Sequence, residues 1–369
     1  MRIGILTYQR AHNHGALLQA YALKKYVESL GHDVEFVDYW PDYHENLFRL
    51  IPSLSNSSSL KWLKALIKVS ISLRKSLRRK RGYTDFIKNE LLLKKIPKYK
   101  THSALSTASY DVVIYGSDQI WREHKYTQSR SFDEVYFGEY LNCTKKISYA
   151  ASMGVTEIES DSLKKMKNLL NNFSHLSVRE NQLQKMIAKF TNVEPKLVLD
   201  PVFLLSQESW LRLLSTERII KEKYIFFYQL LLSKEANDFV ECLKEKTNFR
   251  IVELQGRLNP FKFGKRYHCQ TANSFDFLRL IRDAEIVVST SFHGVAFSIL
   301  FRKKFYAIGM GKNSDRVNTL LQKSGLTERM IDNLNCFDFN NSIKQINENN
   351  FKQEIEYSKF FLKEALNDK

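Results

Sequence analysis

The sequence alternates short apolar runs with polar, glycine-containing loops and amphipathic stretches, and this alternation predicts parallel βαβ units. Residues 2–7 have the pattern of a buried strand, 16–30 that of an amphipathic helix ended by Gly31, and 32–39 that of a second strand. Parallel strands joined in this way require a right-handed crossover. The same rhythm restarts beyond a boundary at 200–206. We therefore expect an α/β fold in which two unequal Rossmann-like domains face one another across a cleft.

The bulk composition indicates the class of protein and its surroundings. A chain of 369 residues is long enough for two domains, which we place at 1–200 and 201–369, with a terminal helix at 351–366. A hydrophobic fraction of 43% and a charged fraction of 26% are typical of a soluble globular protein. No apolar run approaches the roughly 20 residues that span a bilayer, and the N-terminus enters a strand pattern without a signal peptide. We expect a cytoplasmic protein.

The cysteine spacing and the net charge indicate which metal sites, disulfides and charged partners are compatible with the sequence. The four cysteines are far apart and form no CxxC pair; they stand at 143, 242, 269 and 336. This spacing argues against a zinc site or a disulfide framework and favours free thiols in a reducing compartment. The formal net charge of +17 suggests a polyanionic partner, an anionic membrane surface or anionic substrates.

The stretch 60–81 interrupts the alternation and carries nine Lys or Arg residues without an acid. Its apolar stripe and a tryptophan near its start predict a basic amphipathic helix, with Leu60, Trp62 and Lys64 in its first turn. Such a helix fits the surface of an anionic membrane, possible here on the inner face of the cell membrane. It also fits a helix that packs its stripe on the core and leaves a solvated basic face. A nucleic-acid patch is the weaker interpretation, because no aromatic platform accompanies the charge.

The stretch 285–294, EIVVSTSFHG, has the pattern of a buried strand followed by a polar loop and the start of a helix. Ligands of open α/β sheets bind at the carboxyl ends of the strands, and helix N-termini favour anions. The loop holds His293 and three hydroxyl groups, one of them on Ser291. This placement favours a binding site over a capped turn with a surface histidine.

Polar residues also follow the other predicted strands. The loop at 8–15 contains Asn13, which suits a helix N-cap or a binding residue equally. The strand at 111–115 leads into Ser117, Asp118 and Gln119. Asp118 could accept the proton of a sugar hydroxyl as a base, or cap the next helix.

Three basic residues complete this set of candidates. Arg179 ends the strand at 175–178, where its guanidinium could hold a carboxylate or phosphate, or pair with an acid at the surface. Lys312 and Arg316 lie at the start of a helix predicted after the strand at 304–308. Backbone donors together with these two cations would suit a phosphate.

Five stretches, in this order and spacing, resemble the polysaccharide pyruvyl transferase family. They are GILTYQRAHNHGALLQAYAL near the N-terminus, VIYGSDQIW at 113–121, SVRE at 177–180, LDPVFLL at 199–205 and STSFHG at 289–294. The resemblance implies a fold similar to the two-domain glycosyltransferase B type. It also implies transfer of a pyruvyl group from phosphoenolpyruvate, as co-substrate and without a further cofactor, to sugar hydroxyls. The product is usually a cyclic ketal on a surface polysaccharide or its lipid-linked precursor.

The resemblance also implies roles for residues. In characterised members the arginine of the SVRE-like stretch contacts phosphoenolpyruvate, which here is Arg179, and the later histidine takes part in donor binding and acid catalysis, which here is His293. Members often have an arginine where this chain has Ser291, so we expect Lys312 or Arg316 to supply that cation. We expect the second domain to form the donor side, with Arg179 of the first domain and His293 of the second converging on one anion pocket between them.

The first domain then supplies the acceptor side and the base. Acceptor-side candidates are Asn13, Ser117 and Gln119, with Asp118 as a possible base. No metal is required by this chemistry. The alternatives are a glycosyltransferase of similar architecture that uses a nucleotide sugar, and a non-enzymatic basic protein that binds nucleic acid; we do not expect a nucleic-acid partner.

Overall fold

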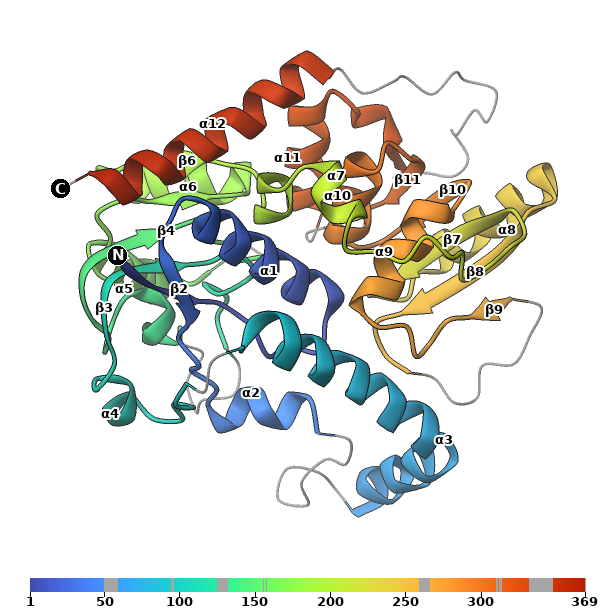
Figure 1. Ribbon diagram of the computed structural model, residues 1–369, viewed down its shortest axis with the longest axis horizontal. Helices are drawn as coiled ribbons and strands as arrows, with labels where there is room; N and C mark the ends of the chain where they lie inside the picture. The colour runs from blue at the N-terminus through green and yellow to red at the C-terminus, as the bar shows by residue number, and fades with distance from the viewer. Residues whose placement is uncertain are drawn as a thin grey trace.

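The computed structural model describes residues 1–49, 59–93, 96–124, 132–154, 156, 158–258, 266–309, 311, 314–331 and 348–368 (Figure 1). The first half is built on a parallel sheet in the order β2-β1-β3-β4. Its strands are β1 Arg2–Leu6, β2 Asp33–Phe36, β3 Ser109–Tyr115 and β4 Asn142–Ser148. Helix α1, His14–Ser29, connects β1 to β2, as the sequence predicts.

The second half is built on a parallel sheet in the order β12-β11-β10-β7-β8-β9. Its strands are β7 Tyr224–Gln229, β8 Arg250–Gln255, β9 Tyr267–His268, β10 Ile286–Ser289, β11 Lys304–Ile308 and β12 Met330–Ile331. The central strands β7 and β10 are buried along their whole length, which explains why their sequences are continuous apolar runs. A short parallel pair, β5 Ser177–Val178 and β6 Lys196–Leu197, lies beside the first sheet.

Helices connect the strands and cover the sheets. Those in the first half are α2 Asp42–Leu47, α3 Ser59–Phe86, η2 Ile87–Leu91, α4 His102–Leu105, η3 Glu134–Phe137, α5 Ser160–Leu170 and α6 Asn181–Phe190. Those after them are η4 Pro201–Leu204, α7 Gln207–Leu211, α8 Lys234–Thr247, α9 Ser274–Asp283, α10 Phe292–Leu300, α11 Asp315–Ser324, η6 Thr327–Arg329 and α12 Glu348–Asn367. Side-chain caps start several of them, for example Asn13 on α1 and the Asn273–Asp276 capping box on α9.

Both sheets reverse strand order at an internal point. In the first sheet β1 lies between β2 and β3, and in the second β7 lies between β8 and β10. Loops at the carboxyl ends of strands on either side of such a point form ligand sites in open α/β sheets. The expected fold class, two Rossmann-like halves as in the glycosyltransferase B type, is confirmed by these two parallel sheets.

The two halves share one apolar core. Trp210 of α7 is fully buried, and its indole packs on Tyr21 of α1 at 5.7 Å and on Phe297 of α10 at 5.1 Å between ring centroids. The indole NH donates to the carbonyl of Val202 at 3.0 Å. Because α1 belongs to the first half and α10 to the second, this tryptophan holds elements of both halves in one packed unit.

The terminal helix α12 spans both halves: Glu354 near its start pairs with Lys323 of α11, and its later turns lie against the first half (Figure 1). Ser358 accepts a hydrogen bond from the backbone NH of Leu199 at 2.9 Å, and Lys145 of β4 donates to the carbonyl of Ala365 at 3.2 Å. His175 approaches Asp368, next to the helix end, at 3.2 Å. The sequence placed this helix at the end of the second half, and in space it crosses to the outside of the first sheet.

Helix α3 is longer than the predicted stretch and turns a mainly polar side inward. Ser72, Arg79 and Tyr83 are buried, while the apolar stripe is exposed, with Leu63, Ile67, Leu73 and Leu77 between 46% and 51% accessible. Packing of that stripe on the core, one of the three interpretations of the sequence, is therefore wrong. Among the described residues, no helix combines the length and apolarity needed to cross a bilayer.

Arg79 is a buried basic residue of α3, and it anchors the inward side of the helix. Its guanidinium donates to the carbonyls of Gln255 at 2.9 Å, Gly256 at 2.7 Å and Gln270 at 3.3 Å. Gln255 and Gly256 lie at the end of β8 and Gln270 lies just after β9, so a side chain of the first half occupies acceptors at two strand ends of the second. Buried carbonyls that lose such a donor carry the full cost of desolvation.

We expect Arg79→Met to lower the free energy of unfolding by about 2–4 kcal/mol, because methionine fills similar space but leaves these buried acceptors unpaired. Arg78→Met, at an exposed position of the same helix, is the matched control and should change stability by less than about 0.5 kcal/mol. Urea unfolding of the purified variants measures both values. Equal stability of the two variants would show that Arg79 does not hold α3 against the second half.

Candidate active site

The loop after β3 has a backbone that few residues tolerate. Gly116 has φ +126°, and a Cβ there would lie 2.2 Å from the carbonyl oxygen of Tyr149. Asp118 has φ +75°, a left-handed conformation that is uncommon for residues other than glycine. Ser117, between them, is fully buried and donates to the carbonyl of Ala150 at 2.9 Å. The loop thus turns Ser117 and Asp118 toward the junction of the two halves.

Asp200 is the buried carboxylate at which the candidate residues meet. Its Oδ2 accepts from Arg179 and from Ser117 at 3.2 Å, and it lies 3.6 Å from Nε2 of His293. Its Oδ1 accepts from the backbone NH of Val202 at 3.1 Å and so caps η4. Burial acts to raise the pKa of Asp200, but His293 and Arg179 outweigh it and lower that pKa to about 2.

Arg179, at the end of β5, is almost completely buried. Besides Asp200, it lies 3.6 Å from Asp118 and 3.8 Å from Glu180, and its guanidinium stands 4.7 Å from the ring centre of Phe292. Burial acts to lower the pKa of Arg179, but Asp200, Glu180 and Asp118 raise it above its usual value. Within the described part of the chain, Nε, which is the atom near Glu180, and Nη2, which is the atom near Asp118, make no hydrogen bond, so two donors of a buried cation lack an acceptor at hydrogen-bond distance.

His293 lies in the first turn of α10, directly against the start of α1. A Cβ at Gly15 would lie 2.1 Å from Nδ1 of His293, so only glycine permits this approach. Ser291 precedes the helix and does not cap it through its side chain. Among the residues that the structure describes, neither Nε2 of His293 nor Oγ of Ser291 has a hydrogen-bond partner. Both face a helix N-terminus, where anions are favoured.

Arg316, in the first turn of α11, lies close enough to Arg179 and Glu180 for their charges to affect its pKa. With the amide oxygen of Gln119 turned toward it, the guanidinium donates to that oxygen at 3.0 and 2.8 Å. Burial and the neighbouring Arg179 lower the pKa of Arg316 to about 10, which leaves it charged at neutral pH. Its Nε has no partner in the described regions. Lys312, the other predicted phosphate ligand, lies outside the described residues.

Glu180 adds a proton to the site. Burial raises the pKa of Glu180 to about 7, against the lowering effect of Arg179 and Arg316. One of its oxygens accepts from Ser152, and the other has no donor among the described residues. Near neutral pH this side chain is therefore partly uncharged, so the two arginines are not fully neutralised.

The predicted acceptor residues are engaged within the protein. Asn13 accepts from the backbone NH groups of Gly15 at 2.9 Å and Ala16 at 3.3 Å, which is the helix-capping alternative of the two that the sequence left open. Ser117 bonds to Ala150 and Asp200, and Gln119 to Arg316. These residues position the site; contact with an acceptor stays a prediction.

Sequence reasoning missed Asp200, Glu180 and Gly15. Asp200 lies inside the stretch LDPVFLL, where Asp-Pro indicates only a strand-to-turn boundary, and Glu180 appeared only as an ion-pair partner of Arg179. Gly15 appears from the sequence to be a turn residue, although its role is to admit the ring of His293. Each role depends on which segments meet in the folded protein, and the neighbouring sequence contains no pattern that predicts such a contact.

Metal-ligand chemistry finds no support in the described regions. They contain no group of three or more His, Cys, Asp or Glu side chains placed to hold an ion. Cys143, Cys242 and Cys269 are free thiols, and Cys336 lies outside the described residues.

Comparison with solved structures finds proteins of similar size and low identity. They include the E. coli heptosyltransferase WaaC with ADP, at 14% identity and a TM-score of 0.42 over 97% of this chain and 100% of that one. The UDP-GlcNAc 2-epimerase from Methanocaldococcus jannaschii has 10% identity and a TM-score of 0.46 over 100% and 94%. The glycosyltransferase SnogD from Streptomyces nogalater has 11% identity and a TM-score of 0.38 over 99% and 95%. No curated protein sequence matches significantly.

A sequence model of one family covers most of the chain. The model described as polysaccharide pyruvyl transferase matches residues 13–311. The match begins at the cap of α1 and includes Asp118, Arg179, Asp200 and His293. The chain therefore belongs to the polysaccharide pyruvyl transferase family.

Proposed function

We propose that this protein transfers the pyruvyl group of phosphoenolpyruvate to two hydroxyls of one sugar in a surface polysaccharide or its lipid-linked precursor. The observation that carries the proposal is the set of buried donors without acceptors around Arg179, Arg316 and His293. Such donors, at a helix N-terminus, suit a small compound with several negative charges.

Phosphoenolpyruvate presents a phosphate and a carboxylate, and the site has donors for both. Nε and Nη2 of Arg179 and Nε of Arg316 supply charged donors, while Oγ of Ser291 and the first NH groups of α10 supply neutral ones. Arg316 stands in for the arginine that Ser291 replaces. Lys312 is a further phosphate ligand in this proposal. Each charge-assisted bond to such a ligand is stronger than a bond between neutral groups.

In this reaction the enzyme must deliver one proton to the enol carbon and accept one proton from each of the two sugar hydroxyls. His293 protonates the terminal CH₂ carbon of the enol, which becomes the methyl group. One sugar hydroxyl attacks the resulting cationic carbon, the C–O bond to phosphate breaks, and a second hydroxyl closes the ketal. The two hydroxyl protons balance the one taken by the carbon and the one carried by the leaving phosphate. Asp118 is the base for an attacking hydroxyl, and Arg179 and Arg316 stabilise the charge on the departing phosphate.

We expect His293→Gln to reduce pyruvyl transfer about 10²–10⁴-fold, because an amide cannot deliver the proton. The same variant should still be stabilised by phosphoenolpyruvate in thermal unfolding, since Arg179 and Arg316 remain. Release of phosphate that depends on a sugar acceptor, followed with mass spectrometry of the product, measures transfer.

Turnover of His293→Gln near that of the wild type would remove the histidine from the chemistry. Stabilisation of the wild type by UDP-GlcNAc or ADP-heptose, with none by phosphoenolpyruvate, would replace the proposal with a nucleotide-sugar glycosyltransferase. His268→Gln, a half-buried histidine on β9, is the control for loss of an imidazole.

The proton held by Glu180 makes stability depend on pH. Its pKa is about 7 in the folded protein and about 4.3 in an unfolded chain. The folded state therefore binds more protons between these values, so stability falls as pH rises through this window and levels off above it.

In Glu180→Gln this contribution is absent. We expect the free energy of unfolding of the wild type, relative to this variant, to fall by up to about 3 kcal/mol between pH 4.5 and 8. Urea unfolding at several pH values measures the difference, with Glu245→Gln on the exposed side of α8 as the control. Parallel pH profiles for the wild type and Glu180→Gln would show that Glu180 carries no shifted proton.

We also propose that α3 rests on an anionic membrane, where a lipid-linked acceptor would lie. Its exposed side combines Leu73 and Leu77 with Arg74, Arg78 and Arg81. Leu63 and Ile67 extend the same side toward the helix start; the side chains of Leu60 and Lys64 are outside the described ones, and Trp62 is half-buried. Apolar side chains between basic ones bind anionic bilayers, and each Lys or Arg adds about 1 kcal/mol at low salt.

We expect the wild type to sediment with vesicles containing phosphatidylglycerol at low salt, and with neutral vesicles far less. Leu73→Ser combined with Leu77→Ser should weaken sedimentation about tenfold or more, because both apolar anchors are lost. Leu231→Ser with Leu232→Ser, at exposed positions beyond β7, is the matched control. Equal sedimentation of the two double variants would place the membrane contact elsewhere or nowhere.

A further inference from the structure

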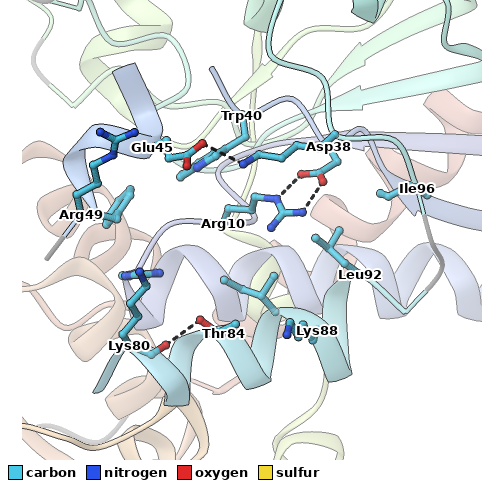
Figure 2. A pocket seen from close by; sticks show the side chains of 14 residues that line it. Arg10, Asp38, Trp40, Glu45, Arg49, Lys80, Thr84, Lys88, Leu92 and Ile96 are labelled. Carbon is cyan, nitrogen blue, oxygen red and sulfur yellow. Dashed lines mark hydrogen bonds and ion pairs between the residues drawn. The ribbon is translucent and has the colours of Figure 1, made fainter. Parts of the chain in front are cut away.

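A cavity of about 350 Å³ lies in the first half, and none of the donor residues that the structure describes lines it (Figure 2). Its walls come from the loop after β1, the segment after β2, α2, and the junction of α3 with η2. The lining residues are Arg10, His12, Asp38, Trp40, Glu45, Phe48, Arg49, Lys80, Thr84, Ile87, Lys88, Leu92, Ile96 and Lys98. This volume is at the lower end of the roughly 300–1,000 Å³ typical of small-molecule sites.

The charges around this cavity do not balance. Arg10 forms a two-bond ion pair with Asp38 (Figure 2). Lys98 donates to Glu45 at 3.0 Å. These two pairs use both acidic residues of the lining. Among the residues that the structure describes, no carboxylate pairs with the side chains of the other three cations, which are Arg49, Lys80 and Lys88. The cavity therefore offers an excess of positive charge to a ligand.

One wall is aromatic and apolar. The rings of Trp40 and Phe48 are stacked at 5.7 Å between centroids, and the ring of His12 lies 5.1 Å from that of Phe48. Burial, with the nearby charges of Lys80 and Arg79, lowers the pKa of His12 to about 4, so the imidazole is neutral and adds no charge. Trp40 is buried, and it is stacked on His44 at 5.0 Å as well as on Phe48, so this wall offers apolar contact without an open indole face.

The cavity lies close to the candidate active site along the chain. His12 lines the cavity, and Gly15 contacts His293. Three residues span at most about 11 Å between Cα atoms. The ring of His12 also stacks on Tyr83 at 5.2 Å, and the Tyr83 hydroxyl bonds to His14 at 3.2 Å. His12, Tyr83 and His14 thus form a continuous packed connection from the cavity wall to the turn that contacts His293.

From these observations we infer that the cavity between α2 and α3 binds the phosphate-bearing end of a sugar acceptor, with Lys80, Lys88 and Arg49 around the phosphate. The assignment of this ligand as the acceptor rests on the proposed function, whereas the binding of a sugar phosphate in the cavity does not. The phosphate belongs either to a lipid-linked sugar or to a soluble sugar phosphate. Leu77, on the exposed apolar side of α3, lies one helical turn before Lys80, so a lipid could continue from the cavity along this helix.

The test is calorimetric titration of the full-length protein with N-acetylglucosamine 1-phosphate and with inorganic pyrophosphate. Lys80→Gln combined with Lys88→Gln should weaken binding of both at least about tenfold, because two charge-assisted contacts are lost. Lys164→Gln combined with Lys167→Gln, at exposed positions of α5, makes the same charge change and should bind as the wild type does.

Equal binding by the two double variants would overturn the inference. So would equal binding of N-acetylglucosamine and its 1-phosphate by the wild type, or no binding of either phosphate. Farnesyl diphosphate below its micelle concentration identifies the source of the phosphate. If farnesyl diphosphate binds the wild type more tightly than pyrophosphate does, and the double variant Leu73→Ser with Leu77→Ser loses this difference, the phosphate belongs to a lipid-linked sugar. If the two compounds bind the wild type equally well, it belongs to a soluble sugar phosphate.

A second readout separates this inference from the proposed function. Stabilisation by phosphoenolpyruvate should be the same in Lys80→Gln with Lys88→Gln as in the wild type, since the donor residues are untouched. If phosphoenolpyruvate fails to bind while sugar phosphates bind through the lysines, only the donor assignment falls. If transfer proceeds and the lysine variant binds sugar phosphates normally, only the cavity assignment falls.

Discussion

The carboxylate of Asp200 is the one interaction on which the candidate site depends. It is almost completely buried, and a buried carboxylate is costly unless cations and donors surround it. Arg179, Ser117 and His293 meet that need, and they come from the end of β5, the loop after β3 and the start of α10. The same contacts hold Arg179 and His293 side by side, each with a polar atom that makes no hydrogen bond among the described residues. The buried ion pair between Asp200 and Arg179 thus holds the residues of the proposed anion site in place.

The relative position of the two sheets follows from contacts that tolerate little displacement. His293 fits against α1 only because residue 15 is glycine, and Arg79 binds three carbonyls at the ends of β8 and β9. Trp210 packs between α1 and α10, and α12 returns to the first sheet. Hydrogen bonds and close packing are directional, so these contacts set where the loops of one half meet those of the other. That meeting creates the site.

The excess positive charge serves different purposes in different places. In α3 alone, Arg79 is buried and binds carbonyls, Lys80 lines the cavity, and Arg78 faces solvent beside exposed leucines. Arg179 and Arg316, elsewhere, are held among buried carboxylates. Adjacent residues of one basic run thus differ in function because a helix turns about 100° per residue. The sequence shows how many basic residues there are, but only the packing decides which of them are buried, line the cavity or face solvent.

The sequence by itself determined the two parallel sheets, because buried strands need continuous apolar runs and their crossover helices need amphipathic ones. It also indicated which strand ends carry polar chemistry, among them Asp118, Arg179 and His293. Only the tertiary structure decided that Asp200 joins these residues, that Asn13 caps α1, and that the apolar stripe of α3 faces outward. These features depend on contacts between segments far apart in the chain, and the local periodicity of a sequence reports the direction of a side chain within its own element but not its partner.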